Sequence, residues 1–218
     1  MSATLIQLVV LAGIAIFLIL RLRSVLGTRD GFEKPPLEGP ARRDARREFE
    51  VIEGGADTDI TDHVKEGSDA AEALARMKRA EPGFHVGEFL TGARGAYEMI
   101  LMAYENGNLE EVRPFLAPEV FEAFDEAIAA REAEGLRVEA SFVGLRDIGI
   151  SDASFDSATS EGEVTVRFTG ELTWVVKNAE GAIVEGNPNE IKRQRDVWSF
   201  ARRMGSDDPN GQLVATGG

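Results

Sequence analysis

The chain has 218 residues, 43% of them hydrophobic, and no cysteine, which excludes disulfides and thiolate metal sites. Its formal net charge of −14 is unevenly spread: residues 21–47 hold eight basic and four acidic side chains, and the chain from Glu48 onward holds 16 and 34, a net of −18. A domain that acidic is a poor candidate for nucleic-acid binding, which depends on neutralising phosphates. The basic stretch before it suits anionic lipid head groups.

The first predicted element is a transmembrane anchor with its flank, residues 1–26. Every residue between 5 and 20 is apolar or glycine except Gln7, and about 20 helical residues span about 30 Å, the thickness of a bilayer's hydrocarbon core. A cleaved signal peptide is disfavoured because the positive residues follow the apolar run and no small-residue cleavage site is present. The side chains expected to lie in the membrane are Leu5, Ile6, Leu8, Val9, Val10, Leu11, Ile14, Ile16, Phe17, Leu18, Ile19 and Leu20.

Arginines behind the anchor predict its orientation. By the positive-inside rule Arg21, Arg23 and Arg29 stay in the cytoplasm, so the N-terminus points out and the C-terminal domain points in. Residues 27–68 are predicted to form a flexible linker that is first basic and then, over 53–67, acidic and disordered. Four further arginines in this linker either attach it to anionic lipid, at about 1 kcal/mol each, or stay solvated without a partner. They are Arg42, Arg43, Arg46 and Arg47.

The domain, residues 69–218, begins with three predicted helices. The first covers 69–81, with Ser68 as its cap and a Pro-Gly pair as its stop. The second covers 84–104 and has the strongest helical periodicity. Gly87, Gly92 and Gly95 within it each lower helix stability by about 1 kcal/mol relative to alanine. We therefore expect another backbone or a ligand to approach the helix closely at these positions. The third helix begins at Pro118 and ends at Gly135.

After Gly135 the hydrophobic period changes from 3.6 to 2, which predicts strands. Alternating runs cover 136–142 and 164–176, and a turn at 178–181 leads to a short strand at 182–185. The segment 186–188 is expected to interrupt this strand before 191–203 resumes it, and 212–216 adds a short last strand. Helices followed by an antiparallel sheet with one buried face predict an α+β fold. We expect bulges or bends at Gly144, Gly149 and Gly170.

Signals for active-site or metal chemistry are weak. The only histidines, His63 and His85, have no metal-site spacing, and the sequence has no phosphate loop and no nucleophile motif. The sequence therefore predicts neither catalytic nor metal-ligating residues, and no cofactor.

Several segments resemble the Tim44-like family, and within it the bacterial TimA-type adaptors. They are residues 84–100, Arg131-Glu132 with Gly135, residues 196–202, and Asp208-Pro-Asn with residues 213–216. The resemblance implies a fold like nuclear transport factor two (cystatin-like), in which about three helices pack on a curved antiparallel sheet to form a cone with an apolar cavity. The cavity lining would then include Phe89, Tyr97, Tyr104, Phe168, Trp174 and Trp198. The residue types alone favour core or rim positions for the two tyrosines and core positions for the two tryptophans. Members usually carry tryptophan after Asp-Pro-Asn, where this chain has Gly211, so the docking of the last strand is in question.

The resemblance also implies a function: a non-enzymatic adaptor, single-pass in the bacterial inner membrane, that binds a protein partner or anionic lipid and is linked to protein translocation. Mitochondrial members tether a chaperone motor through a long N-terminal region that a short linker replaces here, so that tethering is not expected. One alternative is a small-ligand binder or enzyme that uses the cavity; polar groups converging there, His85 or Tyr97 among them, would favour it. A ribosome-associated insertion factor is disfavoured by the acidic domain.

Overall fold

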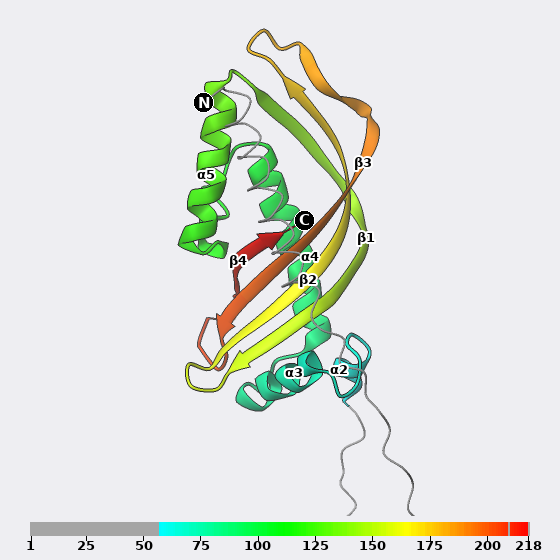
Figure 1. The fold of residues 1–218 in the computed structure, drawn as a ribbon, viewed down its shortest axis with the longest axis vertical. Helices are drawn as coiled ribbons and strands as arrows, with labels where there is room; N and C mark the ends of the chain where they lie inside the picture. The colour runs from blue at the N-terminus through cyan, green and yellow to red at the C-terminus, as the bar shows by residue number, and fades with distance from the viewer. Residues whose placement is uncertain (1–56, 209, 218) are drawn as a thin grey trace, which may run out of the picture. The chain divides into compact units, whose positions relative to one another are not determined.

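The computed structural model describes residues 57–208 and 210–217 (Figure 1). The elements in this part of the chain are, in order, α2 (Thr58–Thr61), α3 (Asp69–Ala80), α4 (Val86–Glu105), the 3-10 helix η1 (Arg113–Phe115), α5 (Pro118–Ala133), β1 (Arg137–Asp156), β2 (Glu161–Lys177), β3 (Ile183–Arg203) and β4 (Gln212–Gly217). The four strands form one antiparallel sheet in the order β1-β2-β3-β4. The predicted α+β class, with helices followed by an antiparallel sheet, is confirmed.

The predicted membrane anchor lies outside the described residues, as does the linker up to residue 56. The arginines assigned to the cytoplasmic flank and to lipid contact lie there too: Arg21, Arg23, Arg29, Arg42, Arg43, Arg46 and Arg47. Within 57–208 and 210–217, no helix has both the length and the apolar character needed to cross a bilayer.

Local sequence signals set the helix ends. The Ser68 hydroxyl accepts a hydrogen bond from the backbone N–H of Ala71 at 3.2 Å, which caps α3 as predicted. Pro118 occupies the first turn of α5, where its missing N–H costs nothing. Gly107 and Gly135 follow the ends of α4 and α5 with φ of 74° and 72°, a conformation that glycine adopts without strain.

Residues 57–67 differ from the predicted disordered linker. Asp57 caps helix α2, where its carboxylate accepts a hydrogen bond from the N–H of Asp59 at 3.1 Å. Ile60 is only 3% exposed and belongs to the core. An acidic segment with one buried isoleucine has too little apolar content to reveal these contacts by composition, so the prediction placed the end of the linker too late.

Strands β1 and β3 are longer than the sequence predicts because bulges absorb their irregular residues. β1 continues past residue 142 through three register shifts, and Gly144 lies at the first of them, as expected. β3 continues through the predicted interruption at 186–188, because a shift between Thr173 and Trp174 of β2 takes up the extra residues. Gly149 pairs in register with Arg167, whereas Gly170 pairs with Leu145 at the edge of the second shift, where the extra residue lies on β1.

Helix α4 lies against the concave side of the curved sheet, with α3 across one end (Figure 1). The inward face of β2 alternates as predicted, and its residues Val164, Val166 and Phe168 are buried. Strand β4 pairs with the end of β3, and its buried Leu213 forms a bridge to Leu116. The last strand therefore docks on the sheet without an aromatic side chain at position 211.

Candidate binding groove along α4

One side of α4 forms the wall of an open groove of about 490 Å³. The opposite wall comes from the segment before α4, the end of β3 and the loop before β4. The large apolar side chains that line the groove as a whole are Phe84, Phe89, Met99, Phe115 and Phe200. Three separate parts of the chain thus bring phenylalanine rings to one surface.

Two of the three glycines in α4 open the helix backbone to this groove. A Cβ added to Gly92 or Gly95 would have no described atom within 4 Å, other than those of its own helix and chain neighbours. The close approach predicted from the sequence is therefore not made at these two positions by the described part of the chain. Gly87 is different, since an added Cβ there would lie 3.6 Å from Oδ1 of Asp59. No described residue occupies the space beside Gly92 and Gly95.

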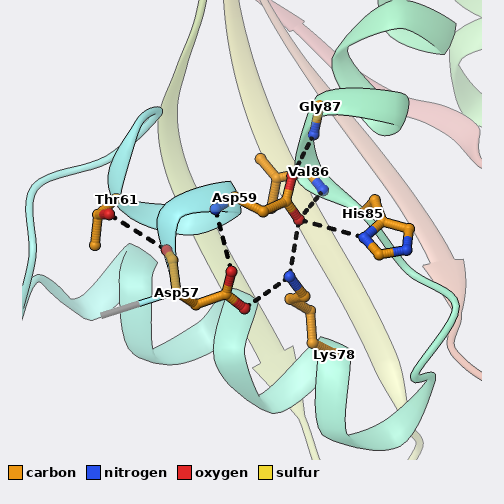
Figure 2. A network of polar contacts seen from close by, with 7 residues as sticks. All are labelled: Asp57, Asp59, Thr61, Lys78, His85, Val86 and Gly87. Carbon is orange, nitrogen blue, oxygen red and sulfur yellow. Dashed lines mark hydrogen bonds and ion pairs between the residues drawn. The ribbon is translucent and has the colours of Figure 1, made fainter. Parts of the chain in front are cut away.

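A carboxylate from α2 holds the end of α4 that borders the groove (Figure 2). The Asp59 carboxylate accepts hydrogen bonds from the N–H groups of Val86 and Gly87 at 2.9 and 3.0 Å and from Lys78 Nζ at 2.8 Å. Burial acts to raise the pKa of Asp59, but these hydrogen bonds outweigh it and lower the pKa to about 2. His85 occupies the N-cap position and makes no side-chain capping bond. Asp59 therefore supplies the cap from a distant part of the chain.

The rim of the groove carries a surplus of negative charge. Glu81 accepts hydrogen bonds from Arg202 Nη2 at 2.6 Å and from the N–H of Gly205 at 2.8 Å. Burial opposes these contacts, yet they lower the pKa of Glu81. The positive charge of Arg202 is thus already balanced. Glu88 is exposed on α4 and takes part in no ion pair with another described residue.

The sheet side of α4 is sealed by aromatic rings. Tyr97 and Phe168 are 0% exposed and their ring centroids are 4.4 Å apart, while the ring of Trp198 lies 4.8 Å from that of Tyr97. Gly170 permits this contact, because an added Cβ would lie 2.7 Å from the Tyr97 hydroxyl oxygen. Three of the six residues predicted to line a cavity therefore fill this part of the interior with their own rings.

Polar side chains do converge at Tyr97. Its hydroxyl donates to Asp196 Oδ2 at 2.6 Å, and the Gln194 side chain donates to Asp196 Oδ1 at 3.1 Å. Burial, together with the hydrogen bond to Asp196, raises the pKa of Tyr97, so the phenol stays a donor at neutral pH. Sequence reasoning missed Asp196 as a partner, because 99 positions separate it from Tyr97.

The other residues predicted to line a cavity are dispersed. The Trp174 indole donates to Glu105 at 3.1 Å, and Lys192 Nζ lies 4.3 Å from a Trp174 ring centroid. Burial raises the pKa of the Glu105 carboxyl, although the bond from Trp174 acts in the opposite direction. Tyr104 packs on Phe124 of α5 with centroids 4.6 Å apart. Among the six, only Phe89 lines the groove.

The described residues contain no cluster of three or more histidine, aspartate or glutamate side chains arranged to hold a metal ion. The groove itself offers an apolar floor, an exposed backbone surface on α4 and the exposed carboxylate of Glu88 on its rim.

Comparisons with known proteins give one consistent result. The family model described as "Tim44-like domain" matches residues 70–218. The human subunit TIM44 of the mitochondrial import inner membrane translocase is 24% identical over 154 residues, which is 70% of this chain and 33% of the human protein. The rat TIM44 subunit is 24% identical over 147 residues, covering 66% of this chain and 32% of its own length. The chain thus spans about a third of the length of these curated relatives.

Among solved structures, the intermembrane-space region of the chloroplast protein ARC6 aligns with a TM-score of 0.38 at 9% identity. That alignment covers 56% of this chain and 88% of the ARC6 chain.

Proposed function

Because this chain belongs to the Tim44-like family, we propose that it is a non-enzymatic adaptor of the bacterial TimA type. Residues 1–26 hold it in the inner membrane with the N-terminus outside and the domain in the cytoplasm. The relatives' membership of an inner-membrane import translocase supports a link to protein translocation. The curved sheet with α4 on its concave side supports a cone like that of nuclear transport factor two.

The observation that carries this proposal is the groove along α4. Its floor is apolar, it is open to solvent, and its two glycines leave unfilled space beside the helix backbone. Open apolar surfaces of this kind are typical of interaction sites. An adaptor requires such a receiving surface, whereas it requires no reactive side chain.

The small-ligand or enzyme alternative rests on the convergence of Tyr97, Gln194 and Asp196. These groups hydrogen-bond to one another, and Tyr97 is 0% exposed. A general acid or base must come within hydrogen-bond reach of its substrate, and the Tyr97 hydroxyl is already committed to Asp196 inside the core. We therefore favour the adaptor.

The anchor is tested by deleting residues 1–22. The shortened chain should move from the membrane pellet to the soluble fraction, because the remaining sequence has no comparable apolar run. The measurement is the distribution of protein after an alkaline wash of the membranes. Continued pelleting of the deleted form would contradict the anchor.

The lipid role of the linker is tested by replacing Arg42, Arg43, Arg46 and Arg47 with glutamine in the form that lacks residues 1–22. Binding to phosphatidylglycerol vesicles should weaken, by up to about 1 kcal/mol per arginine, while binding to phosphatidylcholine vesicles should not change. Equal binding to anionic vesicles before and after the replacement would leave these arginines as solvated linker residues.

The partner-binding role is tested by placing a photo-crosslinking residue at Met99, which lies in the groove and is 38% exposed. The same residue at Ala123, exposed on α5 outside the groove, is the matched control. Mass spectrometry of crosslinks formed in native membranes should identify one partner enriched at Met99. An identical crosslinking pattern at both positions would contradict the groove as the binding surface.

A further inference from the structure

We propose that the groove binds an amphipathic α-helix from the basic, membrane-flanking segment of an integral membrane protein. The apolar stripe of that helix lies on the phenylalanine floor, and its Lys and Arg side chains face the acidic rim. This proposal rests on the proposed function, because the anchor is what would hold the groove near the membrane surface.

The dimensions of the groove favour a helix as the occupant. Its lining runs along α4 from His85 to Met99, about 20 Å at 1.5 Å per residue, which is about four turns of a docked helix. Gly92, Gly95 and Ala96 line this length, and small residues let the backbones of two helices come close together. Extended peptides commonly bind by adding a strand to an open sheet edge. The groove instead has a helix, α4, as one wall, which offers no such edge.

The floor of the groove offers apolar contacts for the side chains of a bound helix. The Phe89 ring lies 6.2 Å from that of Phe84 and 6.3 Å from that of Phe200, centroid to centroid, with tilted and edge-on orientations. Phe84 and Phe200 are only 7% and 6% exposed and form the base of the groove, so the half-buried Phe89 is the ring that an aliphatic side chain would contact. At the far end of the groove, Met99 adds a flexible thioether that adapts to different shapes. A helix with aliphatic residues spaced three and four apart would present one apolar face to this row of apolar groove residues.

The negative charge of the groove rim and of the domain favours a helix with basic side chains. Arg202 is the one arginine among the described residues that line the groove, and it is paired with Glu81. Glu88 forms no ion pair with another described residue. The chain from Glu48 onward carries a net charge of −18, which repels acidic partners and anionic head groups alike. At a membrane, the segments that combine Lys and Arg with apolar residues are the cytoplasmic flanks of membrane-spanning helices.

The test uses the full chain in nonionic detergent micelles and a fluorescent synthetic peptide. The peptide has about 18 residues, with leucines spaced three and four apart and Lys or Arg on both sides of that stripe. Fluorescence anisotropy should show saturable binding. A scrambled peptide of the same composition, and one with Glu in place of Lys and Arg, should each bind roughly tenfold more weakly or worse. Equal binding of either peptide would overturn the proposal.

Two groove variants locate the binding site. Gly95→Leu fills empty space and removes a helix-weakening glycine, so the variant should fold at least as well as the parent. It should lose roughly tenfold or more in peptide affinity, whereas Ala123→Leu on the exposed face of α5 should lose none. Glu88→Lys should weaken binding clearly more than Glu98→Lys, which lies on α4 outside the groove. Unchanged affinity of Gly95→Leu would place the peptide elsewhere and overturn the proposal.

A lipid is the competing occupant, and micelles doped with phosphatidylglycerol distinguish it. If the lipid displaces the peptide from the parent and Gly95→Leu abolishes lipid binding, the groove is a lipid site and the proposal fails. The membrane role is measured separately by the deletion of residues 1–22. If the full chain stays in the membrane but does not bind the peptide, only the helix proposal fails. If the chain without residues 1–22 still pellets with membranes, the proposed anchor fails, and the helix proposal loses its premise.

Discussion

Glycine has opposite roles on the two sides of α4. On the sheet side, a Cβ at Gly170 would lie 2.7 Å from the Tyr97 hydroxyl oxygen, so glycine marks a contact that is already full. On the groove side, Cβ atoms at Gly92 and Gly95 would have no described neighbour within 4 Å, so glycine marks a space that the described domain leaves empty. A glycine inside a helix or strand can therefore mark either a filled contact or an open space, and the sequence alone does not distinguish the two.

The largest expected difference between the two sides comes from removing one phenyl ring on each. Phe168→Ala should cost about 3–5 kcal/mol, because it leaves a cavity among buried rings. Phe89→Ala should cost about half as much or less, because this ring is partly exposed in the groove. Urea unfolding of both variants measures the free energies. An equal or larger cost for Phe89→Ala would mean that the groove is part of the core.

Glycine substitutions should have opposite signs on the two sides. Gly170→Ala should destabilise by about 1–3 kcal/mol, since Tyr97 must move to admit the new methyl group. Gly95→Ala should stabilise by up to about 1 kcal/mol, since the helix gains propensity and nothing is displaced. Thermal and urea unfolding measure both effects. The comparison fails if the two variants shift stability in the same direction.

The cap at the start of α4 should make stability depend on acidity. Asp59→Asn should cost about 1 kcal/mol at neutral pH, because it removes the ion pair with Lys78 and weakens the cap on Val86 and Gly87. The native pKa of about 2 lies below the ordinary value of 3.8. The stabilisation is therefore fully present above about pH 4 and is lost as the pH falls toward 2.

The measurement for Asp59 is the free energy of unfolding of the parent and of Asp59→Asn between about pH 5 and 2. The parent should lose more stability over this range than the variant. Asp62→Asn is the matched control, since Asp62 is exposed and its side chain makes no hydrogen bond or ion pair with other described residues. Parallel curves for the parent and Asp59→Asn would contradict the role of this carboxylate.

The smallest expected effect comes from Gly211→Trp. A Cβ at this position would make ordinary contact at 3.5 Å with the Ala201 carbonyl oxygen, so an indole extending into the groove should raise the melting temperature by about 2–4 °C. It should also reduce binding of the basic peptide by occupying part of the groove. Gly211→Ala is the control and should do neither. A lower melting temperature for the tryptophan variant would mean that the groove does not admit it.

The sequence predicts those features whose physical causes are local. The Ser68 cap acts three residues away, Pro118 and Gly135 act at the positions they occupy, and the alternation of β2 follows from one buried face. The bulged continuations of β1 and β3 were missed because a bulge breaks the alternation on which strand prediction depends.

Features that depend on tertiary contacts were not predicted. Asp59 caps an amide 27 positions away in Val86, and Tyr97 meets Asp196 across 99 positions. The resemblance to the family placed Phe89 in a cavity of the cone, and in the structure this residue lines the open groove beside α4. Residue types alone favoured core positions for Tyr97 and Trp198, and the structure buries both.

The cap from α2 also bears on where the chain can be shortened. The match to the family model begins at residue 70, downstream of both Asp59 and Ile60. A fragment cut at that boundary would leave the Val86 and Gly87 amides without their acceptor and would lose the buried Ile60 side chain. The folded unit is thus longer than the part of the chain that the family model matches. Truncations and chimeras with the relatives should keep the chain from before Asp57 onward.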